Sequence, residues 1–307
     1  MEIHARALRY FDMVRRTRSI RAAARLLHVA SSAVNRQVLQ LEEQLGVPLF
    51  DRLPAGLRLT PAGEIFADHV TKVLQDERRM QGALEELQGL QRGEIAIAAV
   101  EGVNGDLLPH VLEALMRRYP LLQIRQASGG SAVAAQAVVE GDADIAICYS
   151  LGRNPALRQH ALGRFALGAI MPPDHPLAGR ATLRFAECAA YPLILARAPL
   201  SIHDQMRQLV EGHKGPLQVK LETASVDLAR QMCRRGIALA FQTRLGIEAD
   251  LASGALRHVP LRDGAGRPIL SELGIYASAH RSLPAALALA IEWLAAEIAR
   301  REGEEAG

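Results

Sequence analysis

The 307-residue chain is 49% hydrophobic and 22% charged, which is ordinary for a globular protein of two or three domains. It has no apolar run of about 18 residues and does not open with a signal-peptide pattern, so we expect a cytoplasmic protein with no membrane partner. Residues 1–60 hold ten arginines, no lysine and five acids, which gives +5 against a net charge of +3 for the whole chain. A basic head on a mildly acidic body indicates a polyanion as the partner of the head.

Two short helical patterns meet within residues 20–45, after a first amphipathic helix expected over residues 4–16. Ser19 is placed to cap the first of the two. The second has an apolar stripe, and its opposite face carries Ser31, Ser32, Asn35 and Arg36. Residues 28–30 have the length of the turn in a helix-turn-helix, whose second helix places its first residues against base edges. From this stretch alone, a helical hairpin of an all-α domain stays the alternative.

A β-hairpin is expected next, because residues 49–52 and 57–60 alternate in polarity around 53–56. A hairpin after a helix-turn-helix makes a winged arrangement. Arg52 and Arg58 would then lie on the wing, where arginines contact phosphates and supply affinity without sequence information.

Thr60-Pro61 is a helix start, and the helix is expected to run to about residue 89. Apolar residues recur along it at gaps of four and three, interrupted by Glu77, which predicts a seam that pairs two copies. The seam consists of Phe66, Val70, Val73, Met80, Leu84 and Leu87. Packing of this helix against its own domain is the alternative.

After a polar linker over residues 88–93, strands and helices alternate, which predicts a mainly parallel α/β sheet. The pattern restarts near residue 192, so we expect two similar lobes. The expected domains are 1–60 (DNA-binding), 61–89 (linker and dimerisation helix) and 90–307, with lobe 1 at about 94–165 and 267–301 and lobe 2 at about 166–266.

No catalytic pattern stands out. The glycines near residue 129 lack the rest of a phosphate-binding fingerprint, and the ten histidines show no metal-ligand spacing. Cys148, Cys188 and Cys233 are widely spaced, which is typical of reduced core thiols, with a redox-sensing cysteine as the alternative. We therefore expect a protein that is not an enzyme and that has no metal or cofactor.

Over essentially its whole length, the sequence resembles the LysR-type transcriptional regulators. The resemblance rests on residues 8–11, Ala23-Ala24, residues 27–29, Ala33-Val34, Arg36-Gln37, residues 41–52 and residues 59–64. Four positions depart from the family pattern, in which a glycine is common at Arg18, a serine at Ala30, a glutamine at Ser31 and a serine at Asn35. Because Ala30 cannot cap the recognition helix, the cap is expected to pass to Ser31. The DNA-binding residues expected from this reading are Ser31, Ser32, Asn35, Arg36, Gln37, Arg52 and Arg58.

The resemblance also implies that the lobes are similar to periplasmic binding proteins and hold a small effector between them. In open α/β sheets, ligands lie beyond the carboxyl ends of strands and near helix N-termini. The expected effector residues, taken from such positions, are Glu101, Gly102, Val103, Asn104, Ser128, Gly129, Gly130, Ser131, Ser201, Thr223, Ser225, Phe241 and Gln242. Hydroxyls and glycine amides suit a carboxylate, whereas Glu101 favours an effector with an amine or a hydroxyl.

The sequence therefore predicts an α/β protein with an N-terminal winged helix-turn-helix, a long linker helix and a two-lobed effector domain. Its expected function is sequence-specific regulation of transcription, modulated by the effector. The expected partners are double-stranded operator DNA, the effector, further copies in a homodimer or homotetramer, and RNA polymerase. A solute-binding or enzymatic α/β protein with an incidental basic head is the alternative.

Overall fold

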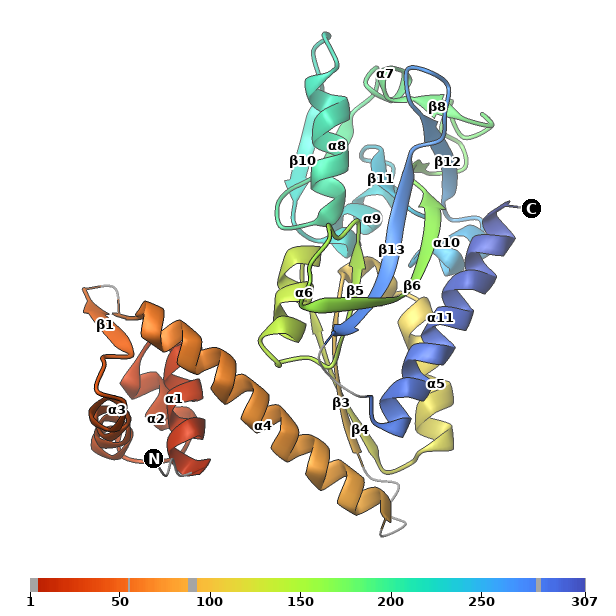
Figure 1. Ribbon diagram of the computed structural model, residues 1–307. Helices are drawn as coiled ribbons and strands as arrows, with labels where there is room; N and C mark the ends of the chain where they lie inside the picture. Colours follow the sequence, from red (N-terminus) through yellow and green to blue (C-terminus); the bar gives the residue numbers. More distant parts are fainter. Residues whose placement is uncertain (1–4, 55, 88–92, 280–282, 307) are drawn as a thin grey trace. The chain divides into compact units, whose positions relative to one another are not determined.

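The computed structural model describes residues 5–54, 56–87, 93–279 and 283–306. The chain divides into two compact units, residues 1–88 and 89–307, which are described separately. Figure 1 shows their elements. Among the described residues, no helix has the length and apolar character needed to cross a membrane.

The first unit begins with three helices around one small core. They are α1 (Ala5–Thr17), α2 (Ile20–Leu26) and α3 (Ser31–Leu45). The Ser19 side chain accepts a hydrogen bond from the Ala22 N–H at 3.3 Å, which confirms the expected cap of α2. His28 adopts a φ of 54° in the turn before α3. This value lies in the left-handed region, where histidine, like asparagine and aspartate, occurs more often than most other residues with a Cβ.

The expected hairpin is also confirmed. Strands β1 (Phe50–Leu53) and β2 (Gly56–Leu59) pair antiparallel, and Ala55 at their turn lies outside the described residues. Helix α4 (Pro61–Leu87) follows, with the Thr60 hydroxyl accepting from the Gly63 N–H at 2.9 Å. The Phe11 ring sits 5.1 Å from that of Phe50 and 4.9 Å from that of Phe66, so α1, the hairpin and α4 share one core.

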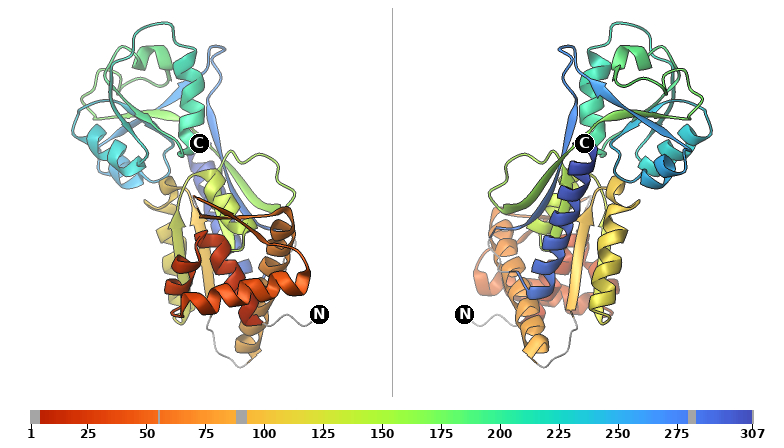
Figure 2. Two further views of the ribbon diagram at one scale, coloured as in Figure 1. Left: turned by 90° about the vertical axis from the view of Figure 1, so that its left-hand side faces the viewer. Right: turned by 90° about the vertical axis from the view of Figure 1, so that its right-hand side faces the viewer.

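In the second unit, lobe 1 is built on a five-stranded sheet in the order β4-β3-β5-β13-β6. The strands are β3 (Gly93–Ala99), β4 (Leu122–Ser128), β5 (Ile145–Tyr149), β6 (Leu157–Ala166) and β13 (Leu270–Ser278). Helices α5 (Leu107–Arg118) and α11 (Ala285–Ala306) lie side by side on one face, and α6 (Ser131–Val139) covers the other (Figures 1 and 2). The alternation along β3 explains this: Ile95 and Ile97 face α5 and α11, whereas Ala96 and Ala98 face α6.

Lobe 2 has a four-stranded sheet, β11-β7-β12-β8, and a parallel pair, β10-β9, joined to it by a bridge between Leu193 and Leu239. Its strands are β7 (Gly168–Met171), β8 (Leu183–Arg184), β9 (Leu193–Ala196), β10 (Val219–Thr223), β11 (Ala240–Gln242) and β12 (Arg257–Arg262). Its helices are α7 (Phe185–Cys188), α8 (Ser201–Glu211), α9 (Val226–Arg234) and α10 (Glu248–Ala252).

The expectation of a mainly parallel sheet is wrong. In lobe 1, β13 runs antiparallel to both β5 and β6, and in lobe 2, β7 runs antiparallel to β11 and β12. The physical reason is that the chain passes between lobes twice, next to Ala166 and Leu270. The long paired strands β6 and β13 make these two passages. Strand β6 runs in the direction of β3, β4 and β5, whereas β13 returns to lobe 1 in the opposite direction.

Candidate functional site

A polar face opens at the start of α3. Ser31, Ser32 and Arg36 are exposed there, and Asn35 and Gln37 are half-buried. The expected cap at Ser31 is wrong, because the helix begins at Ser31 and Ala30 occupies the capping position without a side-chain hydrogen bond. The Ser31 hydroxyl therefore does not cap the helix, because the capping position is the residue before the first helical residue.

The wing is tied to α3. Arg52 donates to the Asn35 side-chain oxygen at 3.4 Å, and the Glu42 carboxylate accepts from the backbone N–H groups of Leu49 and Phe50 at 2.7 and 3.1 Å. Arg58 forms an exposed ion pair with Asp51 at 3.3 Å. Both wing arginines are exposed and lie on β1 and β2.

The expected pairing seam of α4 needs a correction. Phe66 and Val70 are 7% and 0% exposed and belong to the core of their own unit, and Val73 packs against the same cluster. A heptad stripe and a stripe that packs on its own domain look alike in sequence, because both repeat every three and four residues. Met80, further along, is 56% exposed, and the side chains of Leu84 and Leu87 lie outside the described residues.

A cavity lies between the two lobes of the second unit. Eight of the expected effector residues line it: Glu101, Gly102, Gly129, Ser201, Thr223, Ser225, Phe241 and Gln242. They come from the carboxyl ends of β3, β4, β10 and β11 and from the starts of α8 and α9. About 60 Å³ is open to the centre of a water molecule, which is room for roughly four to six waters at about 10–15 Å³ each.

Five expected effector residues do not line this cavity. Val103 is fully buried in the core of lobe 1, and Asn104 donates to the Ser128 hydroxyl at 2.7 Å on the outside. Gly130 lies so close to lobe 2 that an added Cβ would sit 2.0 Å from the Pro199 carbonyl oxygen. The Ser131 hydroxyl is held by the Tyr149 N–H at 2.9 Å and by the Ser201 hydroxyl at 2.7 Å.

Sequence reasoning missed part of the lining. Tyr149, Gln205, Thr243 and Ser271 add polar groups, and an apolar wall is formed by Val100, Ile194, Ala196, Leu200, Ile202, Met206, Val226, Ala229, Ala240 and Leu245. Gln205 was detectable, because it lies one helical turn after Ser201 and shares its face. Ser271 was not, because β13 comes from the far end of the sequence.

Direct hydrogen bonds hold the lobes together across the cavity. The Ser131 and Ser201 hydroxyls lie 2.7 Å apart, and the Tyr149 and Thr243 hydroxyls lie 2.9 Å apart. Ser271 donates a hydrogen bond to the Gln205 side-chain oxygen at 2.8 Å. This arrangement is a closed form of the cleft.

Glu101 makes a further contact between the lobes. From the short helix η1 (Glu101–Val103) of lobe 1, its carboxylate accepts from the Ser225 hydroxyl at 3.1 Å. It also accepts from the Val226 and Asp227 N–H groups at 3.0 and 3.1 Å. The N-terminus of α9 is thereby capped by an anion that the protein itself supplies.

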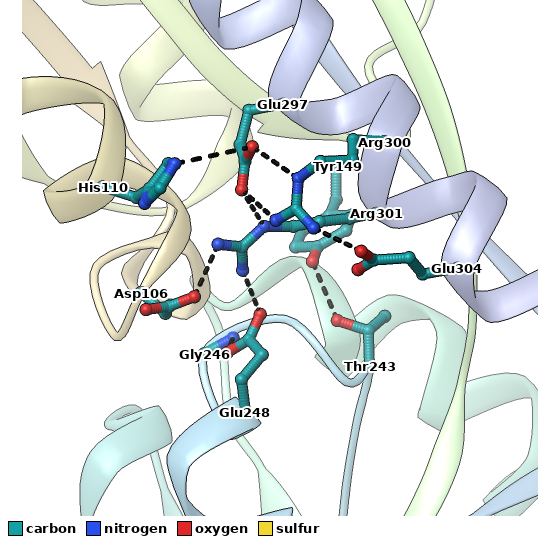
Figure 3. Close-up of polar contacts among 10 residues, drawn as sticks. All are labelled: Asp106, His110, Tyr149, Thr243, Gly246, Glu248, Glu297, Arg300, Arg301 and Glu304. Atoms are coloured by element: carbon teal, nitrogen blue, oxygen red, sulfur yellow. Dashed lines mark hydrogen bonds and ion pairs between the residues drawn. The ribbon is translucent and has the colours of Figure 1, made fainter. Parts of the chain in front are cut away.

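A buried ion cluster joins α11 to lobe 2 (Figure 3). Arg301, 8% exposed, donates to Glu297 at 2.7 Å, to Asp106 before α5 at 2.5 Å, and to Glu248 of α10. Hydrogen bonds from Arg300 lower the pKa of Glu297 to about 2. Burial instead raises the pKa of Glu248. The cluster stabilises this arrangement of the lobes, because separating them would break the contact between Arg301 and Glu248.

The cysteines do not have the character of redox sensors. All three are buried, and burial raises the pKa of each thiol to about 12. The reactive form is the thiolate, which is scarce at neutral pH when the pKa is this high. Among the described residues, no group of three histidines, cysteines or carboxylates could hold a metal ion.

Comparisons with known proteins agree with this architecture. The bacterial regulatory helix-turn-helix family of LysR type matches residues 5–64, and the LysR substrate binding domain matches residues 88–299. A RuBisCO operon transcriptional regulator of Allochromatium vinosum is 28% identical over 83% of this chain and 84% of its own length. A probable cat1 operon transcriptional activator of Acinetobacter lwoffii is 32% identical over 58% of each chain.

Solved structures share the fold. A full-length OxyR variant of Pseudomonas aeruginosa superposes with a TM-score of 0.69 at 22% identity, covering 97% of this chain and 95% of its own. CbnR, a LysR family transcriptional regulator, gives a TM-score of 0.60 at 19% identity and covers 97% and 99%. The family matches span the head and most of the second unit, and the relatives are regulators of transcription, not enzymes or solute-binding proteins. The chain belongs to the LysR family of transcriptional regulators, with a helix-turn-helix DNA-binding domain and an effector-binding domain.

Proposed function

We propose that α3 enters the major groove of a double-stranded operator with its first two turns. Ser31, Ser32 and Asn35 would contact base edges, where an asparagine can pair bidentately with adenine. Arg36 and Gln37 would contact phosphates or bases beside them. Arg52 and Arg58 on the wing would bind flanking phosphates. The observation that carries this proposal is the exposed polar start of α3 beside an arginine-bearing hairpin.

The cleft is proposed to bind a small-molecule effector without a metal or another cofactor. An effector changes the protein only if it binds one lobe arrangement better than another. The hydrogen bonds of Ser201, Thr243 and Glu101 across the cleft give the closed arrangement its own contacts, with which an effector would compete or cooperate. A change in lobe orientation would then alter the spacing of the heads on DNA.

The protein is further proposed to act in the cytoplasm as a homodimer or homotetramer, with RNA polymerase as a partner at the promoter. Two heads related by two-fold symmetry would bind two half-sites about one helical turn, or a multiple of it, apart. Co-purification of the full chain with the polymerase on promoter DNA tests the polymerase contact. No retention of the polymerase would contradict it.

The salt dependence of DNA binding tests the head. We expect Arg36→Ala and Arg58→Ala each to weaken binding to all duplexes and to lower the slope of log affinity against log salt by about 1, because each removes roughly one phosphate contact. Fluorescence anisotropy with labelled duplexes measures the slope. Arg117→Ala, on an exposed turn of α5, is the matched control. Slopes equal to that of the control would contradict the phosphate role.

A further inference from the structure

The cleft supplies its own anion. The Glu101 carboxylate uses the Val226 and Asp227 N–H groups and the Ser225 hydroxyl at the start of α9. Free N–H groups at a helix N-terminus are a ready binding site for a carboxylate. In this protein the donors that an acidic effector would use at α9 are therefore already occupied.

The residues that line the rest of the cavity offer no positive charge to an anion. Among the described residues that line the cavity, none is a lysine, arginine or histidine, and Glu101 is the one charged residue. A carboxylate in this cavity would lose its hydration and lie beside a like charge. Burial of an unpaired charge is strongly unfavourable, and two nearby carboxylates repel each other.

The side-chain amide of Gln242 has no hydrogen-bond partner among the described residues. Gln242 lines the cavity and is 7% exposed, and the described residues give its side-chain amide no hydrogen bond. Its backbone carbonyl accepts from His258 at 3.0 Å, which holds the residue in place. The amide therefore offers one acceptor and two donors to a ligand in the cavity.

The neighbouring polar groups are already engaged. Ser201 is bonded to Ser131, Thr243 to Tyr149, and Ser271 to Gln205. Aliphatic side chains such as Ile194, Ile202 and Met206 make up much of the rest of the wall. A ligand that fits these walls therefore has an apolar body and at least one uncharged hydrogen-bonding group.

We propose that the effector of this cleft is a small uncharged molecule whose hydroxyl, carbonyl or amide group hydrogen-bonds with the Gln242 side chain, and that Glu101 excludes carboxylates from α9. This inference rests on the proposed role of the cleft as the effector site. Of the two effector classes that the sequence leaves open, a carboxylate and a molecule with an amine or a hydroxyl, this proposal keeps only an uncharged hydrogen-bonding group such as the hydroxyl.

Matched pairs of probes separate charge from shape. Isobutyramide and isobutyrate share one skeleton, and benzamide and benzoate share a larger one. The full chain is titrated with each probe at constant ionic strength while its thermal midpoint is followed, since binding to the native state alone raises the midpoint. For the pair that fits, the amide is expected to bind the wild-type protein at least about tenfold more tightly than the acid, a difference of about 1.4 kcal/mol.

Variants assign the effect to single residues. Glu101→Ala frees the α9 donors, so the acid of the pair should gain about tenfold in affinity. Gln242→Leu should weaken binding of the amide probe by a similar factor. Glu113→Ala removes the same charge from an exposed turn of α5 and should leave both affinities unchanged. Glu101→Ser serves in place of the alanine variant if that protein does not fold.

Three results would overturn the inference. In the first, an acid stabilises the wild-type chain as well as its amide does. In the second, isobutylamine or benzylamine stabilises it while neither amide does, which identifies a cation paired with Glu101. In the third, none of the probes raises the thermal midpoint of the wild type or of any variant. DNA binding measured on the same samples reports the regulator function independently, so its failure is distinguishable from failure of the effector assignment.

Discussion

Arg18 shows how one backbone angle can carry strain. Its φ is 51°, and its carbonyl oxygen accepts the Leu57 N–H at 2.9 Å, so the loop before α2 is anchored to the wing. Left-handed φ values cost a residue with a Cβ about 1–3 kcal/mol, and glycine avoids that cost. This explains in physical terms why a glycine is common at this position in the family that the sequence resembles.

Arg18→Gly should therefore stabilise the first unit by about 0.5–1 kcal/mol, because the relief of strain exceeds the added chain entropy of glycine. Hydrogen-exchange protection of the α2 amides in the full chain measures the change. Gly46→Ala is the converse control. Gly46 has a φ of 70°, and an added Cβ would meet nothing within 4 Å, so backbone strain alone should lower the stability of this variant. A loss of protection in Arg18→Gly would contradict this account.

His258 makes the second unit sensitive to acid. Burial lowers its pKa to about 4, against an ordinary value of 6.5. The unfolded chain therefore binds the proton more readily, and stability is lost as the pH falls from about 6.5 to 4, by up to roughly 3 kcal/mol. Stability is unaffected by this group above that range, where both states hold a neutral imidazole.

Denaturant unfolding of the full chain at a series of pH values tests this. His258→Gln keeps a donor for the Gln242 carbonyl and cannot titrate, so its stability should change less between pH 6.5 and 4 than that of the wild type. His69→Gln, on an exposed part of α4, should behave like the wild type. If the stability of the wild type and of His258→Gln changes equally with pH, His258 is not the cause of the acid sensitivity.

At the scale of elements, α4 has two different parts. Its first half packs on its own unit through Phe66 and Val70, whereas Met80 is exposed. An exposed apolar side chain on a long helix is a candidate contact for a second copy. The pairing surface that we propose therefore begins after the residues that the head buries.

Met80→Asp should convert dimers to monomers or raise their dissociation constant by about tenfold or more, because a charge would be buried at the contact. Light scattering over a concentration series measures the molecular mass of the oligomer. Lys72→Asp, on an exposed position of the same helix, is the control for adding an acid to α4. An unchanged mass in Met80→Asp would place the dimer contact elsewhere.

At the scale of the whole molecule, the local patterns were predictable and the long-range contacts were not. The helix expected over residues 4–16 is present as α1, and the expected hairpin is present. Strands β6, β7, β8 and β12 were missed, because their partners lie far away in sequence and β12 contains Pro260, a residue that argues against a strand. The cavity residues at strand ends were partly predictable from topology. The use of Glu101 to cap α9 was not, because nothing near either residue signals a contact between lobes.

The start of α3 is proposed to read base sequence. Selection from a random duplex library with the full chain tests it most directly. We expect an enriched site with two symmetry-related half-sites about one helical turn, or a multiple of it, apart. For Asn35→Ala we expect a relaxed base preference within the half-sites. No enriched sequence, or the same site with equal preference after Ser31, Ser32 and Asn35 are all replaced by alanine, would contradict the claim.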